Sequence, residues 1–368
     1  MGTTVFKRKI YNEILEWKNN RSDKYALLIR GARRVGKSTI VEEFASKEFK
    51  SYIMLDFART SKDINNLFED LYSLDFFFLQ LQQLTGVRLY EQESVIIFDE
   101  VQLLPKARQA IKYLVADGRY KYIETGSLLS IRKNTKDILI PSEEHKIDMY
   151  PMDFEEFLWA IGDEVTADTI RILMENKRPA GNTMHRSLMR IFRLYMLVGG
   201  MPQAVETYVA DNNHANNPSV GMSLEKDAGR YKLFTSDVGL FVTLAFRDKK
   251  YTENIIYNKL LSDKLEANLG YVYENAVAQM LTAKGNKLFY YTMGSETSNH
   301  LHEIDFLIST GDKICPVEVK SENYRNHKSL DNFCRKFSSR IRDKYVVHTK
   351  DYKWENGINY IPVYMVPF

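Results

Sequence analysis

One octapeptide near the start of the chain constrains its fold and chemistry more than any other stretch. Residues 31–38 read Gly-Ala-Arg-Arg-Val-Gly-Lys-Ser and match the pattern G-x-x-x-x-G-K-[ST]. A short apolar run, Tyr25–Ile29, precedes this loop, and a helical pattern, Ser38–Lys47, follows it. In such a context the backbone N–H groups of the loop and the N-terminus of the helix form a cradle for phosphates. The stretch therefore predicts a nucleoside triphosphate site.

Within this loop, Lys37 is expected to contact the β- and γ-phosphates and the Ser38 hydroxyl to ligate Mg²⁺. The glycines let the backbone approach the phosphates closely. The predicted nucleotide-binding residues of the loop are Gly31, Arg34, Val35, Gly36, Lys37, Ser38 and Thr39. The alternative is a chance turn rich in glycine and lysine, which the strand–loop–helix context argues against.

An acidic pair at the end of another apolar run is expected to complete the site. Residues Ser94–Asp99 read SVIIFD and predict a buried strand, and Glu100 follows at once. Asp99 is expected to hold Mg²⁺, and Glu100 to polarise the attacking water as a general base. The alternative for both carboxylates is an acidic helix N-terminus.

Thr125 ends a further predicted strand and is the third candidate catalytic residue, with Glu100 and Lys37. Its hydroxyl is expected to sense the γ-phosphate or to position water. A polar turn at the end of a strand is the alternative.

Strands alternate with helices over the first 150 residues, which predicts an α/β fold with a parallel sheet covered by helices on both faces. The predicted strands are Tyr25–Ile29, Tyr52–Phe57, Ser94–Asp99, Tyr120–Thr125 and His145–Tyr150. One long helix is predicted over Asp63–Leu84. Its apolar stripe is expected to cover one face of the sheet and comprises Leu71, Leu74, Phe77, Phe78, Leu81 and Leu84.

A chain of 368 residues exceeds one small core, so more than one domain is expected. The periodic pattern changes after residue 150, and the Asn-rich stretch Ala210–Ser219 is the best linker candidate. The predicted division is a P-loop domain at 1–150, a small helical lid at 151–209, a linker at 210–230 and a C-terminal domain at 231–368.

Composition narrows the setting but does not identify the partner. The net charge is +3, which permits a local nucleic-acid patch without arguing for one. No apolar run reaches membrane-spanning length, and Cys315 and Cys334 have no metal-ligand spacing. These features predict a cytoplasmic protein that does not bind membranes. Asn134–Asp137 has the letters of a guanine-binding turn in the wrong order, which favours ATP over GTP.

Several motifs together resemble the AAA-like P-loop ATPases of bacteria and archaea that carry a C-terminal domain of unknown function. The matching stretches are Gly31–Thr39, Ile96–Gln102, Glu124–Ser127, Tyr150–Phe157, Leu197–Pro202, Lys232–Leu240, Tyr271–Leu281, Glu303–Ile308 and Pro316–Lys320. The resemblance implies an ASCE/AAA-like P-loop domain and a C-terminal α/β domain of the restriction-endonuclease-like fold. The winged-helix-like middle segment of that family is largely missing, since only Gln203–Ser236 separates the flanking motifs.

A second constellation near the C-terminus has the pattern of a PD-(D/E)XK nuclease site. Glu318 and Lys320 are two apart on a predicted strand and share one face, and Asp305 lies on the preceding strand. Glu274, on a predicted helix, is a candidate third carboxylate. Two or three carboxylates could hold Mg²⁺ and activate water against a phosphodiester of DNA or RNA. The alternative is a solvent-facing salt bridge, which Glu-x-Lys on a strand commonly forms.

Two functional hypotheses follow. The first is an ATPase coupled to a nuclease-like or nucleic-acid-binding C-terminal domain. The second is a nucleotide-dependent switch or scaffold with an inert C-terminal domain that binds a protein partner. Candidates for an arginine finger are Arg108, Arg132 and Arg193.

Overall fold

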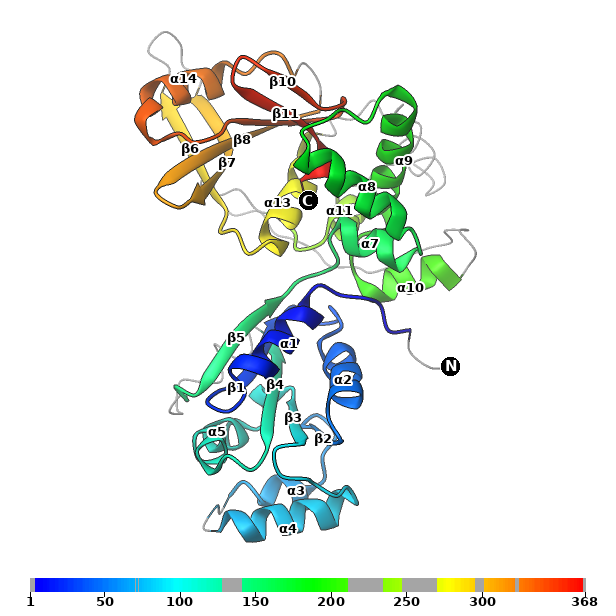
Figure 1. Cartoon of the computed structure of the whole chain (residues 1–368), viewed down its shortest axis with the longest axis vertical. Coiled ribbons are helices and arrows are strands. Elements are labelled where there is room, and N and C mark those ends of the chain that lie inside the picture. Colours follow the sequence, from blue (N-terminus) through cyan, green and yellow to red (C-terminus); the bar gives the residue numbers. More distant parts are fainter. Residues whose placement is uncertain are drawn as a thin grey trace. The chain divides into compact units, whose positions relative to one another are not determined.

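The chain forms two compact units, Met1–Tyr150 and Pro151–Phe368 (Figure 1). The structure, a computed structural model, describes residues 4–69, 71, 73–127, 141–210, 234–246, 270–294, 301–321 and 324–366. The expected linker at 210–230 lies outside these residues apart from Ala210, as do Arg132 and Asn134–Asp137. The described residues on both sides of that linker belong to one compact unit. The division of this unit into a lid at 151–209 and a C-terminal domain at 231–368 therefore stays a prediction.

The first unit is built on a five-stranded sheet in the order β2-β3-β4-β1-β5. Its strands are β1 (Ala26–Gly31), β2 (Ser51–Asp56), β3 (Ser94–Asp99), β4 (Lys121–Ser127) and β5 (Glu144–Met149). Every neighbouring pair is parallel, which confirms the expected parallel sheet. Because β4 lies between β1 and β3, the carboxyl ends of these three strands meet at one edge.

Helices cover both faces of this sheet, as expected for strands that are buried on both sides. The helices are α1 (Ile10–Asn20), α2 (Lys37–Glu48), α3 (Lys62–Asn66), α4 (Leu74–Thr85) and α5 (Pro105–Asp117), with a 3₁₀ turn, η1, at Val101–Leu103. One apolar core joins the α3, α4 and α5 side to alternate residues of the strands, including Leu28, Phe98 and Tyr122. On the other face α2 contacts β1 to β4, and α1 contacts α2 and β5.

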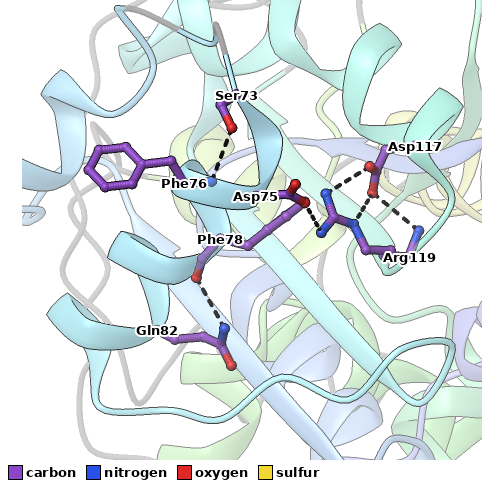
Figure 2. Close-up of polar contacts among 7 residues, drawn as sticks. All are labelled: Ser73, Asp75, Phe76, Phe78, Gln82, Asp117 and Arg119. Carbon is purple, nitrogen blue, oxygen red and sulfur yellow. Dashed lines mark hydrogen bonds and ion pairs between the residues drawn. The ribbon is translucent and has the colours of Figure 1, made fainter.

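The single helix predicted over Asp63–Leu84 is wrong, because two helices, α3 and α4, occupy this stretch. The side chain of Ser61 accepts a hydrogen bond from the backbone N–H of Ile64 and begins α3. Ser73 accepts one from the N–H of Phe76 at 3.4 Å and begins α4 (Figure 2). Serine side chains that cap the backbone compete with continuation of a helix through them.

The new start of α4 determines which residues of the expected apolar stripe are buried. Phe77, Phe78 and Leu81 are buried, as expected. Leu84 is 45% exposed, so the prediction that it belongs to the core is wrong. Leu71 and Leu74 are partly buried against the same core. Arg119 holds the first turn of α4 through its ion pair with Asp75 at 2.6 Å and also binds Asp117 (Figure 2).

The second unit begins with helices, of which the structure describes α7 (Phe154–Ala160), α8 (Glu164–Glu175), α9 (Asn182–Val198), α10 (Pro202–Ala210), α11 (Val238–Phe246) and α13 (Gly270–Ala283). Residues from three of the stretches that carry the family resemblance (197–202, 232–240 and 271–281) meet around buried Asp237. Its carboxylate accepts the N–H of Gly200 at 2.5 Å and of Leu240 at 2.9 Å. Gln279 of α13 accepts the N–H of Val238 at 2.7 Å. These motifs therefore have a structural role.

A six-stranded sheet completes the second unit in the order β10-β11-β9-β8-β7-β6. The strands are β6 (Phe289–Gly294), β7 (Leu301–Thr310), β8 (Lys313–Lys320), β9 (Tyr345–His348), β10 (Lys353–Glu355) and β11 (Ile358–Pro362), with α14 (Lys328–Lys336) packed on one face. The order helix, three strands, helix, strand from α13 to β9 is the one expected from the sequence. The β10–β11 hairpin was not predicted. Among the described helices, none is long and apolar enough to cross a membrane.

Candidate functional site

The loop between β1 and α2 needs its glycines for two different reasons. Gly36 has φ 95° and Arg34 has φ 66°, so two left-handed residues bend the loop back on itself. Gly31 is constrained by space, because a Cβ there would lie 2.2 Å from the carbonyl oxygen of Met149 on β5. Two further predicted residues lie close to this turn. Val35 is buried within the loop, and Thr39 is half-buried in the first turn of α2.

Lys37 is folded into this loop. Its Nζ donates to the carbonyl oxygens of Ala32 at 2.9 Å and Gly31 at 3.2 Å. Burial lowers the pKa of Lys37, while the nearby carboxylates of Glu100 and Asp99 act in the opposite direction. The ammonium therefore lies among the backbone groups of the predicted phosphate cradle.

Asp99 lies at the end of β3 and joins the loop to β4. The Ser38 hydroxyl donates to its two carboxyl oxygens at 2.8 and 2.9 Å, and the Thr125 hydroxyl donates to Oδ1. Burial raises the pKa of Asp99, and the two hydroxyl hydrogen bonds oppose that rise. Asp99 thus directly contacts two residues, Ser38 and Thr125, that were predicted from other parts of the sequence.

Glu100 lies next to this group in a backbone conformation that is unusual for its residue type. Its φ is 54°, and non-glycine residues in this left-handed region are uncommon and often functional. Its backbone N–H donates to the Thr125 hydroxyl at 3.2 Å, and its carboxylate accepts a hydrogen bond from the Gln102 side chain. Gln102 was not predicted as a site residue; it orients the carboxylate proposed as the general base.

Arg8 is a second contact of the loop that sequence reasoning missed. It precedes α1 and is 7% exposed. Its guanidinium donates to the carbonyl oxygen of Val35 at 2.9 Å and to that of Tyr150 at 2.6 Å. A lone arginine in a basic stretch, Lys7-Arg8-Lys9, carries no signal that separates it from surface charge.

Arg108 is not available as an arginine finger, because its guanidinium forms a buried ion pair with Glu144 in the same unit. It is 3% exposed and forms two hydrogen bonds with Glu144, at 2.7 and 2.8 Å. A finger must reach a nucleotide, and a buried bidentate ion pair leaves this guanidinium no such freedom. Arg193, on α9, is half-buried.

Glu124 lies next to this ion pair and immediately before Thr125. It is fully buried, and neither of its carboxyl oxygens has a hydrogen-bond partner among the residues that the structure describes. Burial, and secondarily the charge of Glu144, raises the pKa of Glu124 well above its ordinary value, while Arg108 opposes the rise. A buried carboxylate without a hydrogen-bond partner is costly, so burial favours the protonated form of this side chain.

The second constellation is brought together only in part. Asp305 on β7 accepts a hydrogen bond from the N–H of Val319 at 2.8 Å. Lys320 forms an ion pair with Oε1 of buried Glu318 at 2.7 Å. The other carboxyl oxygen of Glu318 has no hydrogen-bond partner within the described part of the chain. Burial raises the pKa of Glu318, and the charge of Asp305 adds to that rise.

Glu274 does not join these two carboxylates as a third ligand in this structure. Across the described residues, no group of three or more His, Cys, Asp or Glu side chains is arranged to hold a metal ion. Glu274 lies on α13, which contacts β8. Spacing along the sequence gave no information on the direction in which this helix presents its carboxylate.

Two family models match separate parts of the chain. Residues 23–158 match a model described as an AAA domain, and residues 269–366 match a domain of unknown function, DUF4143. The first match and the geometry of the loop support a P-loop ATPase domain in the first unit. The second match assigns no activity. A search of curated proteins gave no match.

Solved structures with local similarity to this chain include the following three. The Walker-type ATPase Paby2304 of Pyrococcus abyssi is 17% identical, with a TM-score of 0.34, over 56% of this chain and 69% of its own. C. elegans PCH-2 is 12% identical, with a TM-score of 0.32, over 71% and 69%. The RuvB Holliday junction branch migration motor of Thermotoga maritima is 10% identical, with a TM-score of 0.32, over 77% and 79%. Scores this low do not by themselves establish a common fold.

The buried Glu124 predicts a pH dependence of stability. In the unfolded chain it ionises near its ordinary pKa of 4.5. Above that pH the folded chain keeps a proton that the unfolded chain has lost, so stability falls as pH rises, by about 1.4 kcal/mol per pH unit until the native pKa is passed. Glu124→Gln should remove this fall in stability as the pH rises above 4.5, as measured by urea-dependent hydrogen exchange of β4. Glu16→Gln, on an exposed position of α1, is the control. An unchanged slope in Glu124→Gln would show that Glu124 is ionised in the folded chain.

Proposed function

We propose that the first unit binds and hydrolyses ATP. The observation that carries this proposal is the contact of Ser38 and Thr125 with Asp99, beside a loop that encloses Lys37. This arrangement offers a cation for the phosphates, oxygen ligands for a metal and a neighbouring acid, Glu100. The match of residues 23–158 to an AAA domain supports the same proposal and favours ATP.

The residues at this site fit Mg²⁺. The Ser38 hydroxyl and the Asp99 carboxylate are hard oxygen ligands of the kind that this ion takes in P-loop proteins. The carboxylate is buried and held by two hydroxyl donors, which a bound cation would supplement. When bound, the ion would neutralise charge on the β- and γ-phosphate oxygens.

The protein groups then have separate roles in hydrolysis. Lys37 exchanges its carbonyl partners for phosphate oxygens, because a charged acceptor binds an ammonium more strongly than a neutral carbonyl does. Glu100 accepts a proton from the attacking water, with its carboxylate oriented by Gln102. Thr125 contacts both Asp99 and the backbone of Glu100, so it can relay a change at the γ-phosphate to the general base.

Replacing Lys37 tests the binding site. Lys37→Ala should weaken ATP binding at least about 100-fold, because the phosphates lose a charged hydrogen-bond donor in a buried setting. Isothermal titration calorimetry measures this affinity. Lys47→Ala, at an exposed position of the same helix, is the matched control and should bind ATP as the native chain does. Equal affinity in Lys37→Ala would refute the site.

Replacing Glu100 separates binding from chemistry. Glu100→Gln should leave ATP affinity unchanged and slow turnover by about 10²- to 10⁴-fold, since the amide cannot accept the proton of water. Phosphate release under saturating ATP measures the turnover. Glu91→Gln, at an exposed position before β3, controls for loss of a nearby charge. Undiminished hydrolysis would remove Glu100 from the mechanism.

For the second unit we propose a nuclease-like or nucleic-acid-binding site at Asp305, Glu318 and Lys320. The supporting observation is that Glu318 is buried on β8 while one of its carboxyl oxygens lacks a partner among the described residues. Two carboxylates are enough to hold Mg²⁺ together with waters and phosphate. The competing function is a nucleotide-dependent switch whose second unit binds a protein partner and catalyses nothing.

Metal-dependent cleavage decides between these two functions. The native chain with Mn²⁺ should cut DNA or RNA, and Asp305→Ala should lose the activity, because the site keeps only one carboxylate. Gel analysis of labelled single- and double-stranded substrates measures the cleavage. Asp312→Ala, in the exposed turn between β7 and β8, is the matched control. If the native chain cuts neither nucleic acid, the switch or scaffold function is the one to retain.

A further inference from the structure

Arg8 lies outside every motif of the nucleotide site, yet its guanidinium reaches the phosphate-binding loop. Only 7% of the residue is exposed, and its Nη1 donates to the carbonyl oxygen of Val35 at 2.9 Å. Its Nη2 donates to the carbonyl oxygen of Tyr150 at 2.6 Å, where the chain leaves β5. One cation therefore ties the middle of the loop to the end of the neighbouring strand.

The Val35 carbonyl matters because it shares a peptide unit with the N–H of Gly36. In a planar trans peptide the carbonyl oxygen and the following N–H point in opposite directions. A guanidinium that holds the Val35 oxygen on one side therefore turns the Gly36 N–H to the other side. Gly36 has φ 95°, a conformation that only a residue without a Cβ adopts readily.

Lys37 and Arg8 together hold carbonyl groups of the loop in the absence of a ligand, and only Arg8 keeps its carbonyl partner when Lys37 turns to the phosphates. The ammonium of Lys37 takes the oxygens of Gly31 and Ala32, and Arg8 takes that of Val35. Phosphate cradles work because N–H groups, and not carbonyl oxygens, face the ligand. With the Val35 oxygen held by Arg8, the N–H group of Gly36 is left to face a phosphate.

We infer that Arg8 is a positioning residue for the polyphosphate cradle, acting by fixing the Val35–Gly36 peptide. This inference rests on the proposed ATP site and deepens it, because it names a residue from outside the loop that determines affinity for the phosphate chain. Arg8 does not touch the reacting atoms. Its loss should therefore raise KM for ATP and leave kcat nearly unchanged, whereas a general loss of folding would lower the amount of active protein and leave KM alone.

Tripolyphosphate isolates the cradle from the nucleoside, so it is the probe of choice beside ATP. In the full chain, Arg8→Met should weaken binding of both ligands by about 10-fold or more, which corresponds to one lost charge-assisted hydrogen bond. Arg8→Lys should be intermediate, because an ammonium lacks the fork that reaches two carbonyls at once. Arg30→Met is the matched control: Arg30 binds the Asp148 side chain of β5 at 2.8 and 2.9 Å, so it also ties β1 to β5.

The outcomes separate the inference from the proposal beneath it. If the native chain binds neither ATP nor tripolyphosphate, the ATP site and the role of Arg8 both fail. If the native chain binds both and Arg8→Met binds them equally well, only the role of Arg8 is overturned, and a lower melting temperature would then mark it as structural. If Arg8→Met does not fold, Arg8→Lys decides, and native affinity in that variant overturns the inference.

Discussion

The Asp99 carboxylate joins the ends of three neighbouring strands, and the candidate site depends on it. Ser38, which follows the β1 loop, and Thr125, at the end of β4, both donate to this one group. The strand order makes this contact possible, because β4 lies between β1 and β3 and all three run in the same direction. A buried carboxylate with two hydroxyl donors is stable without a ligand, and it already holds the oxygens that a cation would use.

Residues whose role is set by local backbone geometry could be predicted from the sequence. The octapeptide of the loop, the strand Ser94–Asp99 and the element order from α13 to β9 depend on short-range patterns of glycine, apolar runs and polar strand ends. Parallel strands then bring Lys37, Asp99 and Thr125 to one edge without further information. The site residues themselves nevertheless stay predictions until a ligand or a variant tests them.

Residues whose role depends on distant partners could not be predicted. Arg8 meets Val35 and Tyr150 across intervals of 27 and 142 residues, and no pattern near Arg8 indicates either contact. Glu124 reads as one more polar strand residue, and its burial beside the Arg108–Glu144 ion pair follows only from the packing of α5. The break between α3 and α4 was missed for the opposite reason, since an apolar stripe outweighed the two serine caps.

The buried carboxylate at Asp237 has a consequence for the length of the chain between the motifs that it joins. Its hydrogen bond to Gly200 brings residues 200 and 237 together, and a Cβ on Gly239 would lie 2.7 Å from the nitrogen of Gly199. The Asp237 contacts therefore hold together the two ends of the segment between these motifs. Loop-closure entropy grows only logarithmically with length, so doubling the length of a flexible connection costs about 0.6 kcal/mol. Insertions and deletions between these two motifs are therefore compatible with the hydrogen bonds that Asp237 makes to its neighbours.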